Sequence, residues 1–170
     1  MQSARQLIDH AKTMIRPKWD EIEDIKLANQ ARVLAAFQEH HVSEYHFAGS
    51  TGYGYNDSGR EAIEALYAQI FGGEAALVRP QLVSGTHAIA TCLAALLEPG
   101  DELISLTGAP YDTLQQVIGI KGDLPQSLVR QGISYKEVPL DESGRWDRKG
   151  ILSTLSPAAK MVMIQRSRGY

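Results

Sequence analysis

Hydrophobic positions recur at helical spacing over the first forty residues. Apolar side chains lie three, four or seven residues apart on both sides of Pro17: Leu7, Ile8, Ala11, Met14 and Ile15 before it, and Ile22, Ile25, Ala28, Ala31, Ala35 and Ala36 after it. This spacing predicts helix with one apolar stripe in each part. We therefore expect an N-terminal helical arm over residues 1–47. By default such an arm packs on its own domain, and the alternative is docking on a partner subunit.

The pattern then changes to the stretch HFAGSTGYGYNDSG, residues 46–59. Its glycines exclude regular helix and suit a loop in which the backbone approaches another group closely. Helical spacing returns over residues 60–71 and ends at Gly72-Gly73.

Strand-like and helix-like segments alternate along the rest of the chain. Strands are predicted at 75–78, 81–83, 101–108, 133–140 and 160–165, and helices at 86–97, 111–120, 124–132 and 147–156. This order predicts the α/β class, with a mostly parallel sheet flanked by helices.

Ligands of such sheets bind at the carboxyl ends of the strands, in the loops that lead into helices. Three segments lie there: residues 84–86, 107–111 and 165–170. The first offers the Gly85 and Thr86 amides, with the Ser84 and Thr86 hydroxyls, to a phosphate at a helix N-terminus, although Ser84 can equally be a simple helix cap. In the second, the Tyr111 ring can stack on a planar ligand or merely pack on its helix. Together they favour a flat phosphorylated cofactor.

Composition limits the other possibilities. The chain has 170 residues, 44% hydrophobic and 22% charged, and a formal net charge of −3, which suits a globular protein and argues against a nucleic-acid or membrane partner. The single Cys92 excludes a disulfide framework and favours the cytoplasm; we expect it to be a small buried side chain. No P-loop motif occurs, and His40, His41 and His46 lack the spacing of metal ligands.

The segment Ser50–Gly119, STGYGYNDSGREAIEALYAQIFGGEAALVRPQLVSGTHAIATCLAALLEPGDELISLTGAPYDTLQQVIG, strongly resembles the aluminium-resistance or methionine gamma-lyase-like family of pyridoxal-phosphate enzymes. These are relatives of the cystathionine beta- and gamma-lyases with the aspartate-aminotransferase fold, fold type I. The resemblance implies that residues 48–170 are the first, incomplete part of the large pyridoxal-phosphate-binding domain. It also implies a carbon–sulfur lyase for sulfur-containing amino acids, with homo-oligomers that share a site between subunits.

The same resemblance implies seven cofactor-binding residues: Ser84, Gly85, Thr86, Tyr111, Tyr53, Tyr55 and Arg60. The first three would hold the phosphate of pyridoxal 5′-phosphate, and Tyr111 would stack on its ring. The last three lie in the YGYNDSGR loop, which is similar in place to a loop that reaches the phosphate of a neighbouring subunit. Arg60 can equally be a solvated residue at a helix start.

The family's Schiff-base lysine lies later than residue 170 in members well over twice this length. None of the chain's own lysines matches it: Lys12, Lys18, Lys26, Lys121, Lys136, Lys149 and Lys160. We therefore expect no catalytic residue in this chain and no activity of the chain alone. Two alternatives stay open: a non-catalytic truncated or assembly-only fragment, and a small nucleotide-binding α/β domain that uses the same phosphate seat.

Overall fold

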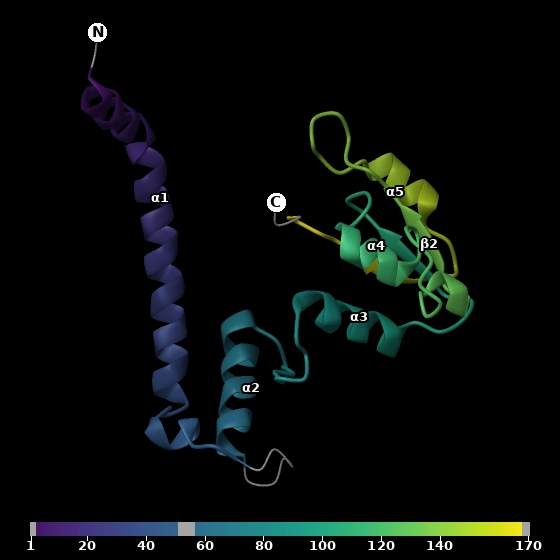
Figure 1. The fold of residues 1–170 in the computed structure, drawn as a ribbon, viewed down its shortest axis with the longest axis horizontal. Helices are drawn as coiled ribbons and strands as arrows, with labels where there is room; N and C mark the ends of the chain where they lie inside the picture. The colour runs from purple at the N-terminus through teal and green to yellow at the C-terminus, as the bar shows by residue number, and fades with distance from the viewer. Residues whose placement is uncertain (1–2, 51–56, 168–170) are drawn as a thin grey trace. The chain divides into compact units, whose positions relative to one another are not determined.

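The computed structural model describes residues 3–50 and 57–167, which belong to two compact units, residues 1–80 and residues 81–170. The helices, strands and 3-10 turns of the described residues follow one another in this order (Figure 1): α1 (Ala4–Glu39), η1 (Glu44–Phe47), α2 (Ser58–Phe71), α3 (Gly85–Leu96), β1 (Glu102–Ser105), α4 (Asp112–Ile118), η2 (Val129–Gln131), β2 (Ser134–Glu137), α5 (Arg148–Thr154) and β3 (Ala159–Met163).

Helix α1 is continuous through the whole predicted arm. Ser3 caps it, with its hydroxyl accepting from the Gln6 amide and the Gln6 side chain accepting from the Ser3 amide, which is a capping box. Pro17 lies inside the helix, where it removes one backbone hydrogen bond, and α1 is bent in its N-terminal part (Figure 1). The two apolar stripes of the sequence therefore belong to one long helix.

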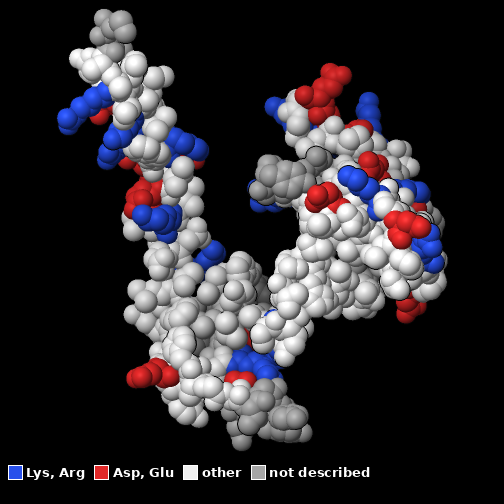
Figure 2. Space-filling model, in the orientation of Figure 1, with Lys and Arg blue, Asp and Glu red and all other residues white. Residues whose placement is uncertain are grey.

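The surface of α1 is mostly exposed. Ala36 is its only buried residue among those described, whereas large apolar side chains such as Ile8, Met14 and Ile22 are exposed. Three exposed ion pairs lie between residues 16 and 26 of α1: Arg16–Asp20, Lys18–Glu21 and Lys26–Glu23. Figure 2 shows these charges of both signs along this part of α1 and few charges near its C-terminal end. Because exposed ion pairs stabilise a helix only weakly and α1 buries little of its surface, contacts within its own unit contribute little to the stability of α1.

Helix α2 confirms the helix predicted over residues 60–71. Asp57 caps its first turn by accepting from the Arg60 amide at 3.0 Å, and Gly72 ends it in the left-handed conformation. Gly59 lies so close to the His46 carbonyl of η1 that a Cβ atom would collide with it. His46 in turn accepts from the Ser43 amide at 3.1 Å.

The second unit contains a parallel sheet with strand order β2-β1-β3. All four residues of β1 are buried, because side chains cover both faces of this central strand. Leu103 packs on one face with Leu93 of α3, with Leu97 just after that helix and with Leu114 of α4. On the other face, Ile104 packs in a second cluster that includes Ile151 of α5. The predicted α/β class and the parallel sheet flanked by helices are confirmed.

Several predicted elements are wrong in detail. Residues 75–78 and 81–83 form no strand, because no described strand lies beside them to pair with their backbone groups. The helix predicted at 124–132 is reduced to η2, since Pro125 and Gly132 leave too short a stretch for a stable helix. Cys92 is exposed rather than buried. Among the described residues, no helix combines the length and hydropathy that a membrane crossing requires.

Candidate functional site

The carboxyl ends of β1 and β3 open into two loops at the same edge of the sheet, since the strands are parallel. The loop after β1 turns sharply at Gly108, whose φ of +75° suits a residue without a Cβ atom. Its carbonyl accepts from the buried Ser105 hydroxyl at 2.6 Å, and its amide donates to the Val138 carbonyl at 2.9 Å. This loop is therefore pinned to the end of β2 before it reaches Tyr111.

The sequence predicts a phosphate-binding site at the N-terminus of α3. The Ser84 hydroxyl accepts from the His87 amide at 3.1 Å, so Ser84 does cap the helix. The Gly85 and Thr86 amides donate to no protein group within the described residues. A Cβ atom added at Gly85 would meet nothing within 4 Å. Two unpaired amides at the positive end of a twelve-residue helix can bind an anion, and there is open space for one.

Tyr111 connects this helix terminus to the sheet edge. Its hydroxyl donates to Thr86 Oγ1 at 3.0 Å, and Thr86 Oγ1 lies 3.2 Å from Thr113 Oγ1 of α4. Its backbone amide donates to Gln165 Oε1 at 3.1 Å, in the segment that follows β3. The ring is half-buried, so it is held at both ends while part of it stays accessible.

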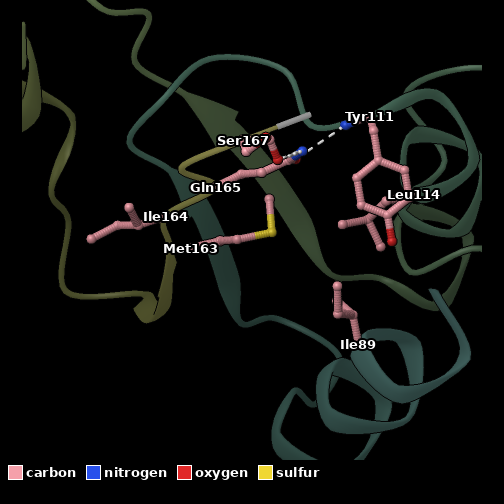
Figure 3. Close-up of a pocket in the computed structure, with 7 residues that line it drawn as sticks. All are labelled: Ile89, Tyr111, Leu114, Met163, Ile164, Gln165 and Ser167. Atoms are coloured by element: carbon pink, nitrogen blue, oxygen red, sulfur yellow. Dashed lines mark hydrogen bonds between the residues drawn. The ribbon is translucent and has the colours of Figure 1, made fainter. Parts of the chain in front are cut away.

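The accessible part of Tyr111 lines a cavity of about 490 Å³. Its other lining residues come from α3, α4, the end of β3 and the segment after it: Ile89, Leu114, Met163, Ile164, Gln165 and Ser167. Figure 3 shows the ring beside Leu114, with dashed hydrogen bonds from the Gln165 amide group to the Tyr111 backbone and to Ser167. Apolar walls with a few fixed polar groups are typical of small-molecule sites.

A second cavity, of about 560 Å³, adjoins the first and shares Ile164 and Gln165 with it. Thr107, Trp146 and Arg166 are among its other lining residues. The Thr107 hydroxyl accepts from the Gln165 amide at 3.1 Å, which ties the loop after β1 to the segment after β3. Gln165 therefore stands between the two cavities.

Four of the predicted site residues lie together in the second unit: Ser84, Gly85, Thr86 and Tyr111. Arg60 lies in the first unit, in the first turn of α2, where its guanidinium is 3.5 Å from the Asp57 carboxylate and only 21% of its side chain is exposed. Hydrogen bonds from the Ser50 hydroxyl and the Arg60 amide hold the pKa of Asp57 below its usual 3.8. Tyr53 and Tyr55 lie outside the described residues, so their role stays a prediction.

Two residues of the site were not predicted individually from the sequence. Thr113 contacts Thr86, and Gln165 contacts Tyr111. A signal for Gln165 was present, because it begins the third segment predicted at the ligand edge of the sheet. Thr113 offered no comparable signal, since a hydroxyl in the first turn of a helix usually serves only the helix.

An ion pair with a buried carboxylate lies at the opposite edge of the sheet, where the strands begin. Glu102 is buried at the start of β1, where its carboxylate accepts from Lys136 Nζ at 2.7 Å and from the Ser156 hydroxyl at 2.9 Å. These bonds lower the pKa of Glu102 below its usual 4.5. Lys160 also lies at this edge, in β3. Within the described part of the chain, no three His, Cys, Asp or Glu side chains gather as a metal site would require.

Comparison with known proteins shows which family the chain belongs to. The family model of methionine gamma-lyase matches residues 4–170. The chain belongs to the methionine gamma-lyase family. A protein of similar sequence is YnbB of Bacillus subtilis strain 168, which is 48% identical over 151 residues, 88% of this chain and 36% of YnbB.

Solved structures resemble the chain equally well. One, described as a "putative cystathionine beta-lyase involved in aluminum resistance" from Listeria innocua, has a TM-score of 0.93 at 47% identity over 100% of this chain and 42% of that one. A second, described as a carbon-sulfur lyase involved in aluminum resistance from Clostridium novyi NT, has a TM-score of 0.89 at 44% identity over 94% of this chain and 39% of that one. The chain thus spans about two fifths of the length of these relatives, and the resemblance to the family expected from the sequence is confirmed.

Proposed function

We propose that this chain is the cofactor-phosphate-binding part of a pyridoxal-phosphate-dependent carbon–sulfur lyase that acts on sulfur-containing amino acids. One observation carries the proposal: Tyr111 O–H donates to Thr86 Oγ1 at 3.0 Å, which joins a stacking ring to an unpaired helix N-terminus. The names of the family and of its solved members support the reaction class. The fold-type I assignment and the large domain beginning near residue 48 belong to the same proposal.

The residues present fit pyridoxal phosphate. The Gly85 and Thr86 amides, with the Thr86 hydroxyl, would bind the phosphate, and the open space at Gly85 admits it. The Tyr111 ring would lie against the pyridine ring, with the apolar cavity beside it. When bound, the cofactor supplies an electron sink for negative charge at the substrate's α carbon.

The chain's own side chains would bind the cofactor and orient it. Thr86 Oγ1 accepts the hydrogen bond that the Tyr111 hydroxyl donates, and with Thr113 also donating to Thr86 Oγ1 the Thr86 hydroxyl would donate to a phosphate oxygen. Leu114, Met163 and Ile89 exclude water from the face of the ring that they line. The lysines of the sheet lie elsewhere: Lys136 is paired with Glu102 at the opposite edge, so we assign no catalytic base to this chain.

The assembly proposed with this function is a homo-oligomer in the cytoplasm, with the site shared between subunits. The exposed apolar side chains of α1, such as Ile8, Ile15 and Ile22, support a helix that is buried by another subunit. Arg60, already half-shielded beside Asp57, is the residue that we assign to a neighbour's phosphate.

The binding proposal is tested by calorimetric titration of the chain with pyridoxine 5′-phosphate. This probe has the ring and phosphate of the cofactor but no aldehyde, so it does not react with surface lysines. We expect saturable binding that Thr86→Val weakens about ten- to hundredfold, the value of one hydrogen bond to a charged group. Thr91→Val is the matched control, because Thr91 lies on α3 and bonds only to the His87 carbonyl.

Three results would count against the proposal. Absence of binding, or equal effects of the two threonine variants, contradicts the phosphate seat. Tighter binding of AMP than of pyridoxine 5′-phosphate favours the nucleotide-binding alternative. For the reaction, the whole protein that contains this chain should release a thiol from cystathionine or methionine, measured with a thiol reagent, and a protein that binds the cofactor without this release contradicts the lyase assignment.

A further inference from the structure

Gln165 makes three hydrogen bonds, of which two join the loop after β1 to the segment after β3. Its side-chain Oε1 accepts from the Tyr111 amide at 3.1 Å, and its Nε2 donates to the Ser167 carbonyl at 2.9 Å. Its backbone amide donates to the Thr107 hydroxyl oxygen at 3.1 Å. The residue is half-buried, so these bonds are partly shielded from water (Figure 3).

The Tyr111 amide depends on this side chain. Tyr111 is the N-cap of α4, so its N–H lies outside the helical hydrogen bonds, and among the described residues no strand pairs with it. Pro110, which precedes it, is fully buried and fixes the direction of the chain. Gln165 Oε1 thus satisfies a partly buried amide that would otherwise lose a hydrogen bond on folding.

Tyr111 is consequently held at two points, its backbone amide and its hydroxyl. Gln165 holds its backbone at the sheet edge, and Thr86 holds its hydroxyl at the N-terminus of α3. The ring between these points is a wall of the apolar cavity. A ring that must lie flat on a ligand stacks best when it is ordered before the ligand arrives.

We propose that Gln165 is a positioning residue, which holds the Tyr111 ring at the angle required for stacking on a planar phosphorylated ligand. This inference rests on the proposed binding of the cofactor and adds a residue to it. The Gln165 side-chain amide performs two tasks: its oxygen accepts from the Tyr111 amide, and its nitrogen donates to the Ser167 carbonyl. A carboxylate can perform only the first task and a thioether neither.

Two variants separate these tasks in the 170-residue chain. Gln165→Met keeps the length and removes both bonds, whereas Gln165→Glu keeps an acceptor for the Tyr111 amide. Gln131→Leu is the control, because the Gln131 side chain donates to the Gln126 carbonyl away from the site. The first measurement is hydrogen exchange of the Tyr111 amide by NMR without ligand, and the second is the affinity for pyridoxine 5′-phosphate by calorimetry.

We expect Gln165→Met to speed exchange of the Tyr111 amide about three- to tenfold, and to weaken binding by a similar factor. Gln165→Glu should keep the protection of this amide and most of the affinity, and Gln131→Leu should change neither. If Gln165→Met unfolds the unit, Gln165→Asn replaces it with the same expectations, because its amide is one methylene too short to reach.

The outcomes separate this inference from the proposed function. Unchanged Tyr111 exchange in Gln165→Met overturns the positioning role. Faster exchange with unchanged affinity also overturns it, since the ring's position would then not matter for the ligand. If the wild-type chain does not bind pyridoxine 5′-phosphate, the proposed function fails, whereas the exchange data still decide whether Gln165 orders Tyr111.

Discussion

Gly85 is the position where the phosphate seat can be tested by charge with little disturbance of the fold. A side chain added there meets nothing within 4 Å, and the residue does not use a glycine-only conformation. An aspartate in the first turn of α3 should stabilise the helix by about 0.3–1 kcal/mol through its dipole. The same carboxylate would repel a phosphate bound by the Gly85 and Thr86 amides.

The magnitude of this repulsion follows from Coulomb's law. One unit charge roughly 5 Å from a phosphate dianion costs about 1.7 kcal/mol in a water-like medium and about 6.6 kcal/mol at an effective dielectric constant of 20. We therefore expect Gly85→Asp to weaken binding of pyridoxine 5′-phosphate at least about tenfold, measured by calorimetry. The isosteric control Gly85→Asn adds the same bulk without charge and should therefore lose less affinity than Gly85→Asp.

Gly85→Asp should stabilise the helix and weaken ligand binding, and these opposite effects make the result decisive. A Gly85→Asp chain that is as stable as wild type and has lost the ligand supports an anion at this helix terminus. Equal affinities of Gly85→Asp and Gly85→Asn would refute it, because the ligand's phosphate would then lie elsewhere. Loss of binding in both variants together would point to bulk rather than charge and would also contradict the electrostatic reasoning.

Three further predictions concern stability, each measured by urea unfolding followed by circular dichroism. Leu103→Ala, at a fully buried position of β1, should destabilise the second unit by about 2–5 kcal/mol, and a loss below 1 kcal/mol would contradict its place in the core. Gly59→Ala should destabilise the first unit because its Cβ atom would collide with the His46 carbonyl, whereas Gly49→Ala, with open space around it, should not; equal effects would argue against the packing of η1 on α2. Glu102→Gln should destabilise the chain at pH 7, and its difference from wild type should shrink as the pH falls below the usual Glu pKa of 4.5, because wild type then protonates the same carboxylate; a difference independent of pH would exclude the ion pair as its cause.

The sequence predicted those elements whose hydrogen bonds are local. Helix α2 and helix α3 begin at capping residues, Asp57 and Ser84, and their apolar spacing is visible without knowledge of the fold. A strand forms only where a neighbouring strand can pair with it, and the sequence alone does not show which segments have such a neighbour. The strand at β1 was therefore predicted correctly, whereas residues 75–78 and 81–83 were wrongly predicted as strands. Among the described residues β1 has partners on both sides, and those two segments have none.

The candidate site was predictable as far as it depends on local turns. The Gly85-Thr86 seat and Tyr111 both follow from where strands give way to helices. The hydrogen bonds that join them were not predictable, because Tyr111 and Gln165 are separated by 54 positions and meet only once β1 and β3 pair. Side-chain contacts of this kind depend on strand register, and β1, which is buried at all four positions, has no alternation of apolar and polar residues from which its register could be predicted.

An NMR titration of the ¹⁵N-labelled chain with pyridoxine 5′-phosphate would locate the ligand directly. If the phosphate binds at the N-terminus of α3 and the ring stacks on Tyr111, the largest shifts should fall on the Gly85 and Thr86 amides, followed by Tyr111 and Gln165. Shifts that are confined to other residues, or no shifts at ligand concentrations that saturate calorimetric binding, would contradict a cofactor site at this edge of the sheet.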